Sequence, residues 1–401
     1  MTVRDEREPS AGAGDAPLRI LEMSTIFHVG GITRHVLALG DWLRARGHQV
    51  SFAGSPGAWL NPTLDPAFIA LDIHGVSGER GDSGVLKRVG KLAATALALR
   101  RRLKAHPVDV IHAHESAPAL VARLATVGLG VPIAVTYHGS APERIGQFGA
   151  VVRRAADRVI AVSRRSAEDL ATRGGVPRDK LQVVGLGLNA PPPVDPARVE
   201  ALRREMLGEG GRLLVTTIAR LAEQKGIDVL IEVARRVVAA RPDIHFSVVG
   251  DGPLDGIAQG WAHDAGVADH VHFVGRSNQP ELHLAAADVF LLTSRWEALP
   301  FTIAEAFQQG VPAIATDCGG VAELIDETVG RVLPIGDAEG LAAAILAVAD
   351  DGDLRKRMAA AAVVRGGEDR FTHDFNNRQL EAAYQDLART ARRGRNRSGG
   401  S

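Results

Sequence analysis

The sequence contains a single cysteine and no long apolar run, and each absence excludes a class of protein. One cysteine, Cys318, cannot form an intramolecular disulfide or the cysteine cluster of a zinc site. No run of about 18 apolar residues is present, so no segment is predicted to span a bilayer. Residues 1–16 lack the apolar core of a secretory signal, so we expect a disordered leader there. These absences predict a cytoplasmic location.

Charge and length narrow the choice further. The 47 basic residues balance 47 acidic residues, which gives no reason to expect nucleic acid as a partner. With 401 residues, 45% of them hydrophobic and 23% charged, the chain has globular composition and enough length for two domains. Two domains imply a cleft, which is a common place for a ligand site.

Short apolar runs alternate with segments of helical period along the chain, which is typical of βαβ units and parallel sheets. A proline-rich stretch at residues 190–196 interrupts the pattern, because it permits neither a helix nor a central strand. We therefore predict an α/β protein of two doubly wound, Rossmann-like domains. The expected strands are residues 18–23, 108–112, 132–137, 158–162, 213–218, 244–249, 271–274, 289–292 and 312–316.

The domain boundaries follow from this pattern. Residues 17–190 are predicted to form the first domain, residues 191–197 the linker and residues 198–370 the second domain. A further amphipathic helix is expected at residues 371–392. The last residues, 393–401, are polar and are expected to form a disordered tail.

Each half of the chain carries a feature suited to a phosphate after its first strand. Gly30 and Gly31 precede a helix, so backbone N–H groups can approach an anion, although a tight turn explains a lone glycine pair equally well. In the second half, Arg220 ends a strand and Lys225 precedes the next helix. Two cations there can neutralise a diphosphate leaving group, whereas solvated surface charge is the simpler alternative for the pair alone.

Two glutamates lie eight positions apart in the richest stretch of the second half. Glu297 follows a strand, and Glu305 falls on a helix that begins near Pro300. A carboxylate can accept two hydroxyl hydrogen bonds, as a ribose offers, although a solvated helix face is the default for such a pair. The segments Gly310-Val311-Pro312 and Gly319-Gly320 that follow make the pattern specific.

At this point the residues resemble glycosyltransferase family 4, a retaining group with the GT-B fold, in which two Rossmann-like domains with parallel sheets face each other across a cleft. The likeness extends over residues 18–390 and includes residues 30–36, 110–114 and 136–139. Family 4 is marked by a pair of glutamates separated by seven residues, as Glu297 and Glu305 are. The resemblance implies transfer of a sugar from a nucleotide diphosphate donor to a glycan, lipid-linked or small-molecule acceptor.

The resemblance also assigns roles to residues. His138 would contact the outer hydroxyl of the donor sugar, Arg220 and Lys225 would hold the diphosphate, and Glu297 would hold sugar hydroxyls; these four form the predicted catalytic set. The terminal helix would return to the first domain. The predicted donor-binding residues are Gly30, Gly31, Arg220, Lys225, Gly275, Glu297, Leu299, Phe301, Thr302 and Glu305. The predicted acceptor-side residues are His114, Glu115 and Gly139.

Three further expectations concern partners and chemistry. His112 and His114 point the same way on a strand, but no third ligand is evident, so we predict no metal and no cofactor. Residues 86–104 form a basic amphipathic helix, which suits either peripheral contact with the inner membrane face or an ordinary surface. The alternatives to a transferase are a non-catalytic nucleotide-sugar-binding protein, a sugar-nucleotide epimerase and a phosphorylase. The donor base and the acceptor stay unassigned.

Overall fold

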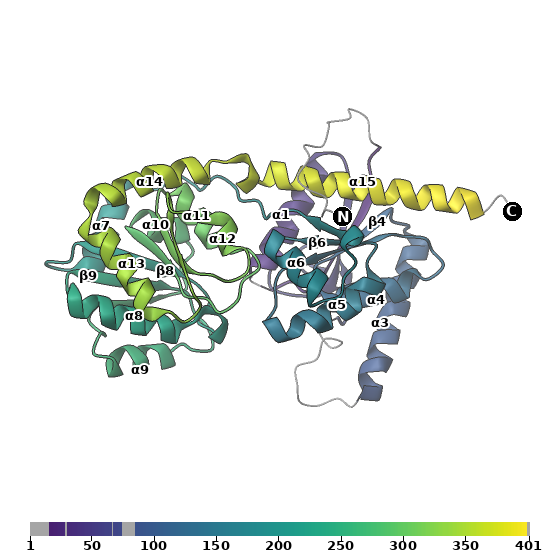
Figure 1. The fold of residues 1–401 in the computed structure, drawn as a ribbon. Coiled ribbons are helices and arrows are strands. Elements are labelled where there is room, and N and C mark those ends of the chain that lie inside the picture. Colours follow the sequence, from purple (N-terminus) through teal and green to yellow (C-terminus); the bar gives the residue numbers. More distant parts are fainter. Residues whose placement is uncertain (1–15, 29, 66, 74–84, 399–401) are drawn as a thin grey trace. The chain divides into compact units, whose positions relative to one another are not determined.

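A computed structural model of the protein describes residues 16–28, 30–65, 67–73 and 85–398 (Figure 1). The predicted leader, apart from Ala16, lies outside these residues. The chain divides into two compact units: unit 1 comprises Met1–Gly187 and His373–Ser401, and unit 2 comprises Leu188–Thr372. Among the described residues, no helix is both long enough and apolar enough to cross a membrane.

Unit 1 contains a seven-stranded parallel sheet with the order β3-β2-β1-β4-β5-β6-β7, surrounded by helices (Figure 1). Its strands are β1 (Arg19–Ile26), β2 (Gln49–Ser55), β3 (Ile69–Ala70), β4 (Val110–Ala113), β5 (Ile133–Tyr137), β6 (Arg158–Ala161) and β7 (Leu181–Val183). Its helices are α1 (Gly31–Ala45), α3 (Val85–Ala105), α4 (Ser116–Thr126), η1 (Pro142–Arg144), α5 (Ile145–Ala155), α6 (Arg164–Thr172), η2 (Arg178–Lys180) and α15 (His373–Ser398). Leu21, Ile111 and Val135 are fully buried in neighbouring strands, as a sheet covered on both faces requires.

Unit 2 contains a six-stranded parallel sheet with the order β10-β9-β8-β11-β12-β13. Its strands are β8 (Leu213–Ile218), β9 (Ile244–Val249), β10 (Val271–Gly275), β11 (Val289–Leu292), β12 (Ala313–Thr316) and β13 (Gly330–Leu333). Its helices are α7 (Pro196–Leu207), η3 (Glu223–Lys225), α8 (Ile227–Ala240), α9 (Ile257–Asp264), α10 (Pro280–Ala285), α11 (Phe301–Gln308), α12 (Val321–Leu324), α13 (Ala338–Asp350), α14 (Gly352–Gly366) and η4 (Asp369–Phe371). The predicted pair of Rossmann-like sheets is therefore confirmed.

The direction of strand addition reverses at one place in each sheet. In unit 1 the reversal lies between β1 and β4, and in unit 2 it lies between β8 and β11. Open parallel sheets bind ligands beyond the carboxyl ends of the strands at such a switch point. The fold thus directs attention to the loops that follow these four strands.

Two predicted boundaries are corrected by the structure. The linker ends before Pro196, which is the first residue of α7, because the Asp195 side chain accepts from the Ala197 amide and caps this helix. The tail prediction is wrong for residues 393–398, which continue α15. Arginine favours helix, so the segment propagates to Ser398 despite Gly394.

The terminal helix α15 packs within unit 1, against α1 and β4 (Figure 1). Glu381 binds Arg46 at 3.0 Å and His48 at 2.8 Å. The Tyr384 side chain is fully buried and reaches His112 on β4. Residues 272 positions apart in sequence therefore share one core, which keeps this helix on the first domain.

The helix α3 presents two different faces. Ala96, Leu99 and Leu103 are buried against the sheet, whereas Val89 is 59% exposed and Leu97 is 49% exposed. Val89 lies on the same side of the helix as Ala96 and Leu103, as the seven-residue spacing predicts, but this side is buried only in the later turns. The exposed apolar residues accompany basic residues on the outer surface.

Candidate functional site

The loop after β8 carries two of the predicted cations. Arg220 is exposed at the end of the strand, and within the described part of the chain no acidic side chain pairs with it. Lys225 lies five residues later, in the turn η3 immediately before α8. Both residues therefore lie at the carboxyl end of β8, beside the switch point of this sheet.

The loop after β11 brings Glu297 to Lys225. The Lys225 Nζ atom donates to Glu297 Oε1 at 2.5 Å, and the Ser294 hydroxyl donates to the same oxygen at 2.7 Å. The lysine side chain is 19% exposed and the glutamate side chain 8% exposed. Two residues that are 72 positions apart thus form one partly buried ion pair, which fixes the carboxylate.

Backbone contacts hold these two loops together. The Arg295 amide donates to the Gln224 carbonyl at 2.7 Å, and the Thr293 hydroxyl donates to the Lys225 carbonyl at 2.9 Å. Gly226 has a φ of 59°, and a Cβ atom there would lie 2.2 Å from the Thr293 carbonyl oxygen. Only glycine permits this approach, so the loop sequence itself sets the Lys225 position.

A second glycine supports Glu297 from the other side. Gly319 has a φ of 52°, and its Cβ would lie 2.0 Å from the Glu297 carbonyl oxygen. The next amide, that of Gly320, donates to the Ala298 carbonyl at 2.9 Å. Nearby, burial and the negative charge of Glu297 raise the pKa of Cys318 to about 12, so this thiol stays protonated and is no nucleophile.

The helix α11 contributes the remaining donor-side predictions. Phe301 and Thr302 occupy its first turn, where backbone N–H groups have no partner within the helix and the helix dipole favours an anion. Leu299 precedes the helix, and Glu305 lies half-buried in its second turn. Gly275 ends β10 with a φ of 73°. All predicted donor residues other than Gly30 and Gly31 therefore belong to unit 2.

The phosphate loop predicted in the first half begins α1. Gly30 immediately precedes the helix and Gly31 is its first residue. Both glycines are exposed, and a Cβ atom at either would meet no neighbour within 4 Å. A larger side chain would therefore fit at either position. What the two residues provide is an exposed helix N-terminus.

The acceptor-side histidine belongs to a buried chain of polar side chains. His114 Nε2 lies 2.7 Å from Glu22 Oε2, and His114 Nδ1 lies 3.0 Å from His138 Nε2. Glu22, on β1, and His114 are both fully buried, whereas His138 is partly exposed after β5. Burial and neighbouring histidines hold the pKa of both His114 and His138 well below the ordinary value. Both rings are therefore neutral.

His112 joins the same cluster from β4. Its Nδ1 atom lies 2.6 Å from the Tyr384 hydroxyl and 3.1 Å from Glu22, and its Nε2 atom lies 2.7 Å from the Thr136 hydroxyl. Glu22 is thus the third possible ligand that the sequence did not reveal beside His112 and His114. The possible ligand atoms of these three residues lie within 4.8 Å of one another. Among the described residues, these three side chains form the one cluster of histidine and carboxylate groups close enough to hold a metal ion.

The other acceptor-side predictions have local partners. Glu115 precedes α4, and its carboxylate accepts from the Thr25 amide at 3.0 Å, which ties the end of β1 to that helix. Gly139 follows His138 with a φ of 95°. The structure therefore brings His114 and His138 into contact, while Glu115 is engaged with the backbone beside them.

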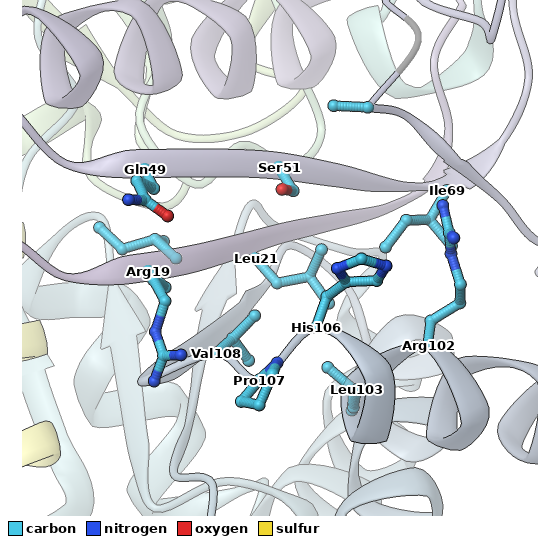
Figure 2. A pocket seen from close by; sticks show the side chains of 12 residues that line it. Arg19, Leu21, Gln49, Ser51, Ile69, Arg102, Leu103, His106, Pro107 and Val108 are labelled. Atoms are coloured by element: carbon cyan, nitrogen blue, oxygen red, sulfur yellow. The ribbon is translucent and has the colours of Figure 1, made fainter.

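A pocket of about 290 Å³ lies at the amino ends of strands in the unit 1 sheet, whereas the switch-point loops follow the carboxyl ends. Figure 2 shows that Arg19, Leu21, Gln49 and Ser51 line it from two strands, and that His106 lines it beside the end of α3. These residues surround the amino ends of β1 and β2, and none of them is a predicted site residue. The pocket is therefore separate from the switch point.

Sequence reasoning missed the residues that position the site. Glu22 is a charge inside an apolar run, and such a residue in a covered strand must have a buried partner, which was a usable signal. Tyr384 gave no such signal, because the pattern of a helix does not identify the strand against which it packs. Thr136 gave none either, because a threonine is an ordinary strand residue. The Ser294 hydroxyl donates to Glu297, and the Gln224 side-chain amide donates to the Trp296 carbonyl. Both contacts depend on how the loops fold, which the sequence pattern does not encode.

Comparisons with known proteins agree with this geometry. Residues 29–190 match the profile of Glycosyltransferase Family 4, and residues 199–364 match that of Glycosyl transferases group 1. The phosphatidyl-myo-inositol mannosyltransferase of Mycolicibacterium smegmatis is 28% identical over 379 residues, covering 90% of this chain and 91% of that protein.

Two further similarities extend the comparison. The lipopolysaccharide core biosynthesis mannosyltransferase LpsB of Rhizobium meliloti is 29% identical over 308 residues, covering 73% of this chain and 83% of that protein. Among solved structures, Anabaena HepE in complex with UDP-glucose has 20% identity and a TM-score of 0.76, covering 92% of this chain and all of that one (100%). The structural likeness shows a shared fold.

Proposed function

Because the chain belongs to the family 4 glycosyltransferases, with the GT-B pair of Rossmann-like units, we propose that it transfers a hexose from a nucleotide diphosphate sugar to a hydroxyl acceptor. The observation that carries the proposal is the Lys225–Glu297 pair beside Arg220 at the switch point of unit 2. A diphosphate needs cations and a sugar needs a fixed carboxylate, and this wall of unit 2 supplies both. HepE, a structural neighbour, binds UDP-glucose, which supports a donor of this class.

We propose that the donor diphosphate is bound without a metal ion. Arg220, Lys225 and the amides of Phe301 and Thr302 supply the positive charge and the N–H donors that a departing diphosphate requires. Transfer assayed with excess chelator should then proceed at the rate measured without it. A rate that falls with chelator and returns with a divalent cation contradicts this part of the proposal.

The stereochemical course that we propose is retention by attack from the leaving-group face. The bond from the sugar anomeric carbon to phosphate oxygen breaks, the bond to the acceptor oxygen forms on the same face, and the acceptor proton passes to the β-phosphate. Glu297 is occupied by Lys225 and Ser294, which favours hydroxyl binding over a covalent intermediate of the double-displacement type. Product NMR reports the anomeric configuration, and an inverted product contradicts retention.

The experiment that tests the whole proposal has two steps. A thermal-shift panel of nucleotide diphosphates first selects the donor base, because a ligand of the folded state raises the melting temperature. The matching labelled sugar nucleotide is then incubated with and without acceptors. Transfer that depends on an acceptor supports the proposal; binding without turnover indicates a non-catalytic protein, and release of free sugar without acceptor indicates an epimerase.

The acceptor is proposed to be lipid-linked and reached from a membrane surface through α3. Both curated relatives named above act on lipid-bearing molecules by name, and the same helix α3 exposes the apolar Val89 and Leu97 and the basic Lys87 and Lys91. Vesicles rich in anionic lipid should bind the protein, and Leu97→Asp should weaken binding, whereas Val364→Asp, at an exposed apolar position of unit 2, should not. Binding insensitive to anionic lipid contradicts the membrane role.

A further inference from the structure

The buried cluster of unit 1 contains an uninterrupted row of hydrogen bonds from β1 to the end of β5. It begins at the carboxylate of Glu22, passes through both ring nitrogens of His114 and ends at His138. Within the described part of the chain, no hydrogen-bond partner is found for Nδ1 of His138, and His138 is the one residue of the row that is not fully buried. The row thus connects a buried carboxyl group to Nδ1 of His138.

Hydrogen-bond direction along this row follows from elementary chemistry. An ionised Glu22 carboxylate would only accept, and His114 Nε2 would then carry the proton that faces it. A neutral imidazole has one N–H group, so His114 Nδ1 is an acceptor, and the proton between the two rings belongs to His138 Nε2. The remaining nitrogen of His138, Nδ1, is then an acceptor as well.

We propose that Glu22 and His114 are positioning residues that hold His138 in its Nε2–H tautomer, so that Nδ1 accepts a hydrogen bond from a substrate hydroxyl. The role of His138 toward a sugar hydroxyl rests on the proposed function, whereas the tautomer does not. A hydroxyl that donates to Nδ1 leaves its own oxygen oriented for other donors. His35 stabilises the ring from one side, with ring centroids 5.7 Å apart in an edge-to-face contact.

A metal ion held by Glu22, His112 and His114 accounts for the cluster less well. All four nitrogens of the two rings already have partners, including Tyr384 and Thr136. The Glu22 oxygen lies 2.7 Å from His114 Nε2, a hydrogen-bond distance. Two ligand atoms of one tetrahedral zinc ion, each about 2.1 Å from the metal, lie roughly 3.4 Å apart. The observed spacing fits a shared proton.

The test reads the tautomer directly. Protein labelled with ¹⁵N-histidine distinguishes Nε2–H from Nδ1–H rings by two-bond nitrogen–proton correlations, and the unmodified chain should show Nε2–H for both His114 and His138. In Glu22→Gln, whose amide can donate or accept, His138 should become a mixture. Thr136→Val is the matched control, because it removes a buried hydroxyl that bonds His112 in the same cluster and leaves the contacts of Glu22, His114 and His138 in place, and His138 should stay Nε2–H.

Activity supplies the second readout. Glu22→Gln should lower kcat/KM about 10- to 100-fold, the loss expected for one misdirected hydrogen bond. A donor lacking the hydroxyl that His138 binds should be used equally well by the variant and the unmodified chain. A dominant Nδ1–H ring in the unmodified chain, an unchanged His138 in Glu22→Gln, or stoichiometric metal on the purified protein overturns the inference. Absence of sugar transfer with the expected tautomers overturns the proposed function alone.

Discussion

The two switch points share one strand topology but hold opposite kinds of chemistry. At β1 and β4 the polar groups are fully buried and bonded to one another, as the contacts of Glu22 and His112 show. At β8 and β11 the charges keep solvent access: Arg220 is exposed, and Lys225 is partly so. One unit therefore holds its polar groups in a closed, buried network, and the other keeps its cations in contact with solvent.

The difference indicates how each unit would treat a ligand. A closed hydrogen-bond network fixes the histidine rings before any ligand binds. Such fixed rings favour ligand hydroxyl groups whose hydrogen bonds point in the matching direction. Lys225 has three N–H donors, so its bond to Glu297 leaves two for an anion such as a diphosphate. Unit 1 would thus select hydroxyl groups by hydrogen-bond direction, and unit 2 would attract the negatively charged diphosphate.

The largest effect is expected from removing the cation that defines the second switch point. Lys225→Ala should lower kcat/KM about 10²- to 10³-fold, because it removes a charge that stabilises the departing diphosphate and leaves Glu297 without its ion-pair partner. Steady-state kinetics with the confirmed donor measures the loss. Lys356→Ala, at an exposed position on α14, should behave like the unmodified chain. Equal activity of the two variants would mean that Lys225 does not hold the donor.

A second prediction concerns the glycine that joins the two loops. Gly226→Ala should lower the free energy of unfolding of unit 2 by about 2–4 kcal/mol, since it combines a left-handed backbone with a clash against Thr293. Gly266→Ala is the matched control, with a φ of 71° and no atom within 4 Å, and should cost about 1 kcal/mol. Denaturant unfolding measures both values. Equal costs would show that the close approach contributes nothing.

The third prediction uses pH to separate the units. Burial lowers the pKa of His35, His114 and His138 well below the ordinary value, so the folded unit 1 binds fewer protons than the unfolded chain below about pH 6.5. The free energy of unfolding of unit 1 is therefore highest above about pH 6.5. It decreases at lower pH by up to about 1.4 kcal/mol per pH unit for each of these histidines.

Hydrogen exchange of backbone amides, corrected for the intrinsic rate, measures this effect within one molecule. Between pH 6.5 and 5, about one and a half units below the ordinary histidine pKa, protection of β4 should fall more than protection of β11. The variant His114→Gln should flatten the dependence in β4. If protection of β4 stays constant over this interval, the cluster is not held neutral by the fold.

The sequence predicted the repeating strands and the charged loops, but not the contacts between them. Periodicity identifies a buried strand such as residues 213–218 from its own residues, and the structure has that strand with the same bounds. The strands β2, β3, β7 and β13 were missed. Strands β3 and β7 have only two and three residues, and β2 and β13 contain glycine and polar residues that interrupt the apolar pattern. Lys225 and Glu297 were both selected, yet their ion pair depends on a loop contact made by Gly226 and Thr293, which spacing does not encode.

The smallest effect is expected from the ion pair at the outer edge of the same loops. Arg295 binds Asp228 through two hydrogen bonds of 2.9 and 2.6 Å and thereby lowers the pKa of that carboxyl. Both side chains have substantial solvent access, so Asp228→Asn should destabilise unit 2 by only about 0.3–1 kcal/mol. Because Arg295 also bonds the Glu223 carbonyl beside Lys225, kcat/KM should fall by roughly two- to fivefold. A loss as large as that of Lys225→Ala, measured by the same kinetics, would instead place this pair in contact with the donor.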